Sequence, residues 1–311
     1  MNEEDARSWL AEGSGLLKGR RYDEALAAFN WAVTLEADNV SAWTLKAAAL
    51  EGLHRYEEAL ECCERALALD ASAAPVYSQK AFVLSRLHRD QEALEVARRA
   101  IVLDPRDADG FSASGSALLA LRRSQEALEA YEYALKLDPS HIRSSAGKSG
   151  ALTSLRRYEE ALWAAQHAIA LDPFYATSHN NKAAALRNLR RPEEALAAYQ
   201  RAIQLDPRHA IAHSNLSLVL IGLNCYVEAL AACDRAIALD PDLPSAYNNR
   251  AVALVFLKRN DEALAAIERS IQLNPGHRAP YINKAVLLFR LGLYGEAFAA
   301  FKLFWRFRRA R

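Results

Sequence analysis

Residues 108–139 read ADGFSASGSALLALRRSQEALEAYEYALKLDP, and this stretch decides the fold. It contains small residues such as Gly115 and Ala127, and two antiparallel helices can pack closely only where small side chains face each other. Larger side chains such as Phe111 and Tyr131 fill the flanking grooves. The closing Leu-Asp-Pro ends the second helix, because proline cannot continue a helix and disfavours one before it. The stretch therefore predicts a pair of antiparallel helices.

The same pattern repeats along the chain with a period of 34 residues. The phrase EAL, or a close variant, places an alanine at positions 25, 59, 93, 127, 161, 195, 229, 263 and 297. A spacing held over eight successive intervals without insertion or deletion identifies an array of structural repeats. Counted from Ala6, the repeats start at residues 6, 40, 74, 108, 142, 176, 210, 244 and 278. Positions within each repeat are numbered below as places 1 to 34.

This pattern resembles the tetratricopeptide repeat (TPR) family, whose unit is a helix–turn–helix of 34 residues. The fourth repeat matches the aromatic, small and proline places of that family at Phe111, Gly115, Ala127, Tyr131, Ala134 and Pro139. The resemblance implies an all-α fold, a right-handed α-solenoid superhelix of stacked antiparallel helix pairs. We expect an N-terminal tail at residues 1–5, a single solenoid at residues 6–303 and an aromatic and basic end at residues 304–311.

Two departures from the family pattern bear on packing. Ser145, His179 and His213 replace the aromatic residue at place 4, which should loosen packing there. Place 7, most often leucine in the family, is basic at Lys46, Lys80, Lys148, Lys182, Arg250 and Lys284. These long side chains can bury their stems and keep their charges in water. Alternatively, they form a row of positive charge for an acidic ligand.

Composition and charge narrow the classes of function. Half of the residues are hydrophobic and a quarter are charged, so the chain can bury a sizeable core. A net charge of +1 argues against the broad basic surface of a nucleic-acid binder. The acidic N-terminus lacks the pattern of a signal peptide, and no apolar run approaches the roughly 18 residues of a membrane span. We expect a cytoplasmic protein that does not bind nucleic acid and does not span a membrane.

The sequence carries no signature of an enzyme, a cofactor or a metal site. It has no Gly-rich phosphate loop, no HExxH and no GxSxG motif, and its histidines follow the repeat rather than converge. Cys62, Cys63, Cys225 and Cys233 form no CxxC pair and have no histidines at zinc-finger spacing, which favours small core side chains. We therefore expect no catalytic residue, no cofactor and no metal.

In the family, the stacked first helices form a concave surface for ligands, lined at places 2, 5, 6, 9, 12 and 13. In the last four repeats places 5 and 6 carry a row of asparagines: Asn180, Asn181, Asn215, Asn248, Asn249 and Asn283. A side-chain amide offers donors and an acceptor, so this row could bind the backbone of an extended peptide of any sequence. The row resembles the asparagine ladder in the TPR arm of O-GlcNAc transferase. The alternative is that the amides merely solvate the groove.

Apolar residues lie beside the asparagines: Leu218, Ile221, Val252, Val255, Phe256, Val286 and Phe289. Four hydrogen bonds at about 0.5–1.5 kcal/mol each contribute at most about 6 kcal/mol. Micromolar affinity requires about 8 kcal/mol after the cost of association. Apolar contacts must supply the difference. Among these residues, Leu218, Val252, Phe256, Val286 and Phe289 are the predicted peptide contacts.

The first five repeats place charged residues in the groove instead: Lys18, Arg86 and Arg143 with Glu51 and Asp109. This half is interpreted as a solvated face or as a weak site for an acidic ligand. The carboxylate clamp by which some TPR domains bind chaperone C-termini has lysine at place 5 and asparagine at place 9. No repeat here has either residue at that place, so we expect no clamp.

The C-terminus departs most from the repeat. Phe304 occupies a place that is alanine or serine in all earlier repeats, and Phe304, Trp305 and Phe307 carry large apolar area beside several arginines. A repeat array normally ends in a polar cap. Three roles are open: packing on the last repeat, an interface with a second copy or a partner, or contact with an anionic membrane surface.

The sequence thus predicts a non-catalytic scaffold or adaptor that binds an extended peptide segment of a partner protein in its groove. A second hypothesis is a structural or assembly module that forms a homo-oligomer, or docks an enzyme, through its aromatic C-terminal end. A third is that the chain is the TPR arm of a larger transferase. TPR scaffolds serve many functions on one fold, so the sequence names no partner.

Overall fold

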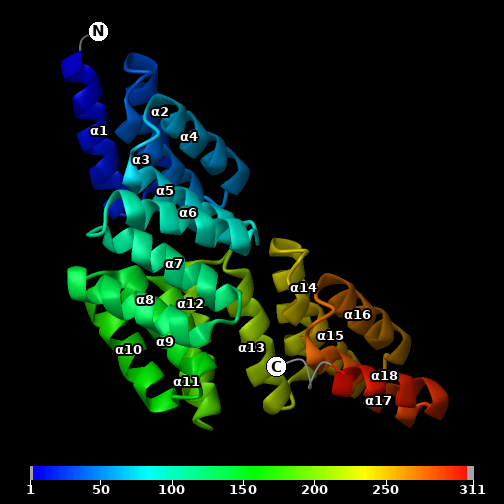
Figure 1. Ribbon diagram of the computed structural model, residues 1–311. Helices are drawn as coiled ribbons and strands as arrows, with labels where there is room; N and C mark the ends of the chain where they lie inside the picture. Colours follow the sequence, from blue (N-terminus) through cyan, green and yellow to red (C-terminus); the bar gives the residue numbers. More distant parts are fainter. Residues whose placement is uncertain (1–2, 307–311) are drawn as a thin grey trace. The chain divides into compact units, whose positions relative to one another are not determined.

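The computed structural model describes residues 3–306, and across them it consists of eighteen α-helices and no β-strand (Figure 1). The helices are α1 (Glu3–Lys18), α2 (Tyr22–Leu35), α3 (Val40–Gly52), α4 (Tyr56–Leu69), α5 (Ala74–Arg86), α6 (Asp90–Leu103), α7 (Ala108–Ala120), α8 (Ser124–Leu137), α9 (Ile142–Ser154), α10 (Tyr158–Leu171), α11 (Ala176–Asn188), α12 (Pro192–Leu205), α13 (Ala210–Gly222), α14 (Tyr226–Leu239), α15 (Pro244–Phe256), α16 (Asn260–Leu273), α17 (Arg278–Arg290) and α18 (Tyr294–Arg306).

Each repeat is one pair of helices, an odd-numbered first helix and an even-numbered second helix. Each helix packs against the next from α1 to α9 and again from α11 to α18. The chain divides within α10, after Ala164, into two compact units, which we describe separately. Helix α1 begins at Glu3 and so includes part of the expected N-terminal tail. The prediction of an all-α solenoid of stacked helix pairs is confirmed.

Small residues lie where the helices approach most closely. Ala59, Ala66 and Ala81 are fully buried, as their positions in the pattern predict. Tyr131 requires even smaller neighbours: a Cβ atom built on Gly147 would lie 2.3 Å from its Cζ atom, and one built on Gly115 would lie 2.8 Å from its Cε1 atom. Real Cβ atoms do not approach other atoms so closely, so the fourth and fifth repeats depend on glycine at both places.

The turn inside each repeat has the same backbone throughout the array. Place 15 has a positive φ in all nine repeats, at Arg20, His54, His88, Arg122, Arg156, Arg190, Asn224, Lys258 and Gly292. The N–H of the next residue then bonds the carbonyl of place 11, as Arg55 does with Leu50 at 2.9 Å, which closes the first helix with a Schellman motif. Glycine is favoured at such a position, yet only the last repeat has one, so the packing of the helix pair imposes this conformation elsewhere.

The residues at place 4 make one recurring hydrogen bond to the preceding repeat. Tyr77 and Tyr247 donate their hydroxyl groups to the carbonyls of Ala71 and Pro241, at 3.0 and 3.1 Å. His179 Nε2 lies 2.9 Å from the carbonyl oxygen of Pro173, and His213 Nε2 lies 3.1 Å from that of Pro207. An imidazole N–H thus takes over the role of the tyrosine hydroxyl. The expectation that these histidines loosen packing stays a prediction. Ser145 is buried.

The basic residues at place 7 bind carboxylates of the preceding repeat. Lys80 pairs with Glu64, Lys148 with Glu132 and Lys284 with Glu268, at N–O distances of 3.3, 2.9 and 3.0 Å. Arg250 pairs in the same way with Asp234, at 2.7 Å. Their stems are partly buried, as expected of snorkelling side chains. Because four of the six charges are neutralised by neighbours, this row is not a free positive surface for an acidic ligand.

Candidate protein-binding surfaces

The predicted asparagine row lies on the first helices of the second unit, α11, α13, α15 and α17. Asn180, Asn248 and Asn249 are buried, while Asn181, Asn215 and Asn283 are half-buried. The structure thus places these six residues on successive helices at equivalent positions. It also shows that the row is less open to solvent than the sequence suggests.

The amides of this row link each repeat to the one before it. Asn215 donates an N–H to the side-chain oxygen of Asn180 at 3.2 Å, and Asn283 donates in the same way to Asn248 at 2.8 Å. Asn249 donates instead to the backbone carbonyl of Ser214 at 2.9 Å. These bonds satisfy buried polar groups, whose loss would cost about 1–3 kcal/mol each. The first role of the row is therefore to join neighbouring repeats.

Each amide retains further hydrogen-bonding capacity, because it carries two N–H donors and an oxygen acceptor. The half-buried Asn215 and Asn283 can use this capacity toward a ligand, whereas Asn249 is enclosed. Contact between the row and a peptide backbone stays a prediction, centred on the more accessible members.

The predicted apolar contacts fall into two groups. Leu218 on α13 is exposed, Val252 on α15 is half-buried, and the exposed ring of Phe256 stacks on Tyr226, with the ring centroids 4.4 Å apart and the planes at 4°. Val286 and Phe289 belong to the last first helix, α17, and both are exposed there. Leu218 and Val252 thus form an apolar row within the array, whereas Val286 and Phe289 lie at its end.

In the first unit, charged side chains of the predicted groove bind one another. Glu51 on α3 is only 7% exposed, and it accepts hydrogen bonds from Gln79 Nε2 at 3.0 Å and from Arg143 Nη2 at 3.1 Å. Arg86 lies 3.6 Å from the same carboxylate. The guanidinium of Arg143 also lies over the ring of Phe82, 4.3 Å from its centroid. One arginine of α9 therefore holds together residues of α3 and α5.

This cluster shifts the acidity of its carboxylate. Burial alone would raise the pKa of Glu51, but the charges of Arg143 and Arg86, with the hydrogen bonds from Gln79 and Arg143, hold that pKa below its ordinary value of 4.5. Glu51 is thus ionised and paired at neutral pH. The interpretation as a solvated face is wrong for Glu51, which is buried, but it holds for Lys18 and Asp109, which are exposed. The guanidinium groups of Arg86 and Arg143 are paired with Glu51, so they are not free to bind an acidic ligand.

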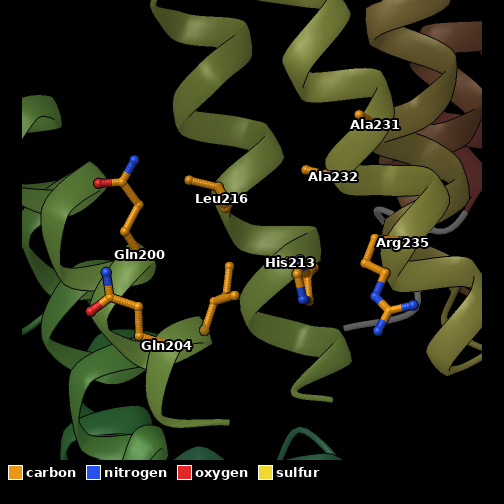
Figure 2. Close-up of a pocket in the computed structure, with 8 residues that line it drawn as sticks. Gln200, Gln204, His213, Leu216, Ala231, Ala232 and Arg235 are labelled. Atoms are coloured by element: carbon orange, nitrogen blue, oxygen red, sulfur yellow. The ribbon is translucent and has the colours of Figure 1, made fainter. Parts of the chain in front are cut away.

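An open pocket of about 580 Å³ lies on the second unit between α12, α13 and α14 (Figure 2). Gln200 and Gln204 project from α12, His213 and Leu216 from α13, and Arg235 from α14. Leu216 occupies place 7, and Gln200 is the residue that would otherwise carry the pairing carboxylate. The pocket therefore lies where the ion pair that joins other repeats is absent. The sequence analysis did not predict this pocket. The leucine at place 7, where six other repeats have a basic residue, would have indicated it.

The three predicted interface residues of the C-terminal end differ in their surroundings. Phe304 is half-buried, and the guanidinium of Arg278 lies 4.5 Å from its ring centroid, whereas Trp305 is exposed. Phe304 therefore packs back against α17 within its own repeat. Phe307, the third predicted interface residue, lies outside the described residues.

The described residues also bear on metal binding, on membrane insertion and on the cysteines. No cluster of three or more histidine, cysteine, aspartate or glutamate side chains could hold a metal ion there. Among the helices α1–α18, none is both long and apolar enough to cross a bilayer. Cys62, Cys63 and Cys233 are buried free thiols, as expected of core residues, while Cys225 is partly exposed.

Comparison with known proteins assigns the chain to a family. A model of the tetratricopeptide repeat matches residues 112–176, 180–244 and 248–304, and a second model of the same repeat matches residues 40–72. No curated protein matches the sequence. The chain is similar to a solved chain described as "Crystal structure of APC/C hetero-tetramer Cut9-Hcn1", with a TM-score of 0.77 and 16% identity over 93% of its length. It spans 57% of that chain, and at this identity the likeness shows the fold alone. Because the first model covers more than half of its residues, the protein is a member of the tetratricopeptide repeat family, a helical scaffold for protein interactions.

Proposed function

We propose that the protein holds an extended segment of a partner polypeptide along the face of α13 and α15 that carries Leu218, Val252 and Asn215. The carrying observation is that Leu218 is exposed one helical turn from Asn215, whose amide is partly accessible. An apolar row beside amides offers both kinds of contact that binding to an extended backbone requires.

Most of the binding free energy should come from the apolar row, not from the amides. The amides already bind neighbouring repeats, so a ligand gains only their remaining capacity, at about 0.5–1.5 kcal/mol for each bond. Burying exposed apolar surface contributes about 25 cal/mol per Å², so the side chains beside the row decide whether a peptide binds tightly. The proposed ligand is therefore an extended segment with apolar side chains spaced along one edge.

The test begins with a random-peptide library displayed on phage and selected on the full-length protein. The affinity of the selected peptide is then measured by fluorescence anisotropy for the wild type and for Leu218→Glu. We expect this substitution to weaken binding at least tenfold, about 1.4 kcal/mol, because it places a carboxylate against apolar peptide side chains.

The matched control is Val227→Glu, which introduces the same charge at an exposed valine on the second helix of the same repeat. Its affinity for the peptide should equal that of the wild type. Equal binding by all three proteins would refute the proposed site, and circular dichroism would verify that each variant keeps its helices.

A further inference from the structure

The last second helix, α18, exposes aromatic side chains at places that earlier repeats cover. Phe301 is 39% exposed, whereas its equivalent one repeat earlier, Ile267, is fully buried. Phe298 is 58% exposed, whereas Leu128 at the same place of the fourth repeat is 2% exposed. Inside the array these places are covered by the following first helix: Ile267 forms one apolar cluster with Leu287 of α17. In the described residues, α18 thus exposes the face that is buried between repeats elsewhere in the array.

Tyr294, at the start of α18, is also more open to solvent than its place in the array would suggest. At its place in the seventh repeat, Tyr226 stacks on Phe256 of the following repeat. Tyr294 is 63% exposed and contacts only the edge of its own neighbour Phe289 among the aromatic rings described, at a centroid distance of 5.2 Å. We name the exposed set the end face, and its members are Val286, Phe289, Tyr294, Phe298, Phe301 and Trp305.

The N-terminal end of the described array exposes different side chains. Places 3 and 10 of a first helix face the preceding repeat, and they are buried in α3 as Ala42 and Ala49. In α1 the same places are Ser8 and Gly15, and both are exposed, as is Glu12 between them. These places of the described N-terminal end are therefore polar or small, although the half-buried Trp9 stacks beside them on Trp31, which is 51% exposed. A head-to-tail contact would bury the end face against a carboxylate and a serine, which is unfavourable.

We propose that the end face binds the same face of a second copy of this chain, related by a two-fold axis. Of the two ends of the described array, this one exposes the larger set of apolar side chains, and a two-fold arrangement places each apolar patch against the same patch of the other copy. A fully exposed aromatic side chain presents roughly 150–250 Å², so the six partly exposed side chains of both copies can bury about 1,000 Å² in total. This area reaches the lower limit of a specific protein–protein interface.

The charges near the end face are compatible with this arrangement. The ammonium of Lys302 lies 4.5 Å from the ring centroid of Phe298, and the guanidinium of Arg278 covers the half-buried Phe304. Each cation thus lies over an aromatic ring, and the exposed Lys302 can keep its contact with water while the ring is covered.

The inference is independent of the proposed peptide site. It assigns Val286 and Phe289 to the end face, whereas the peptide test uses Leu218 on α13. Either proposal can fail without the other.

The experiment measures the mass of the full chain by multi-angle light scattering and by sedimentation equilibrium over a wide concentration range. We expect the mass to rise from that of the 34.5 kDa chain to twice that value and to stay there. Phe298→Glu should weaken the pairing at least about a hundredfold, because a two-fold interface contains each substitution twice. Phe298 is exposed, so the variant should keep its helical signal.

Two control variants distinguish the arrangements. Gly15→Glu alters the N-terminal end, where a Cβ atom meets nothing within 4 Å, and Val102→Glu alters an exposed valine on α6. Both should still form the pair. A wild-type chain that stays monomeric, a mass that grows beyond two copies, loss of the pair in Gly15→Glu, or an unchanged pair in Phe298→Glu would each overturn the proposal.

Discussion

Replacing Gly147 by alanine should lower the free energy of unfolding by about 2 kcal/mol, within the range that overpacking of a core costs. The new Cβ atom would lie 2.3 Å from Cζ of Tyr131, whose buried ring cannot move away easily. The hydroxyl of Tyr131 lies 3.1 Å from Ser116 Oγ, a hydrogen bond that ties the far end of the ring to α7. Urea denaturation followed by circular dichroism measures the effect.

A matched glycine provides the control for this prediction. Gly15→Ala also changes a helical glycine, but its Cβ atom meets nothing within 4 Å, so it should be neutral or stabilise the protein by up to about 1 kcal/mol. Tyr131→Leu should remove most of the cost of Gly147→Ala in the double variant, because it removes the ring atoms that clash. If Gly147→Ala and Gly15→Ala behaved alike, the close approach of α8 and α9 would be wrong.

Arg143→Met should destabilise the first unit by about 2–3 kcal/mol at neutral pH. The variant keeps an apolar side chain near Phe82 but leaves the buried Glu51 with Arg86 and Gln79 as its remaining partners. Removing one partner of a buried pair costs up to about 3–5 kcal/mol, and the partial exposure of Arg143 lowers our figure. Glu51→Gln should cost less, because the guanidinium left behind can turn toward water.

The pKa of Glu51 determines how the destabilisation by Arg143→Met should change with pH. The pKa of Glu51 is lower in the folded protein than its ordinary value of 4.5. The pair therefore contributes stability above that value, and the contribution is lost as the pH falls through the folded pKa. In Arg143→Met the burial of Glu51 is less offset, so its pKa should rise and the deficit should shrink on acidification. A deficit that is constant from neutral pH to pH 4 would mean that the charge of Glu51 is not involved.

The fold could be predicted from the sequence because a repeat array depends on local signals. The spacing of alanines such as Ala59 fixed the helix pairs, since each repeat contacts mainly its neighbours. The turn conformation was missed at His54 and its equivalents, because glycine, its usual marker, stands only at Gly292. Packing between the two helices overrides the preference of the single residue there.

The binding surfaces could be predicted only in part. The asparagines of the amide row lie at the predicted places, but the pattern did not show that Asn215 donates to Asn180 across repeats. The pairing of Arg143 with Glu51 joins residues 92 positions apart, and it depends on how successive repeats turn relative to one another. Small changes of angle accumulate over several repeats, so a 34-residue pattern carries no such information.

The central claim, that a partner segment lies along α13 and α15, is tested most directly by amide hydrogen exchange with and without the selected peptide. We predict that peptide binding slows exchange in α13 and α15, whereas exchange in α3 and α5 of the first unit, whose inner face is filled by Glu51 and Arg143, stays the same. Protection confined to the first unit, or to the pocket between α12 and α14, would contradict the account.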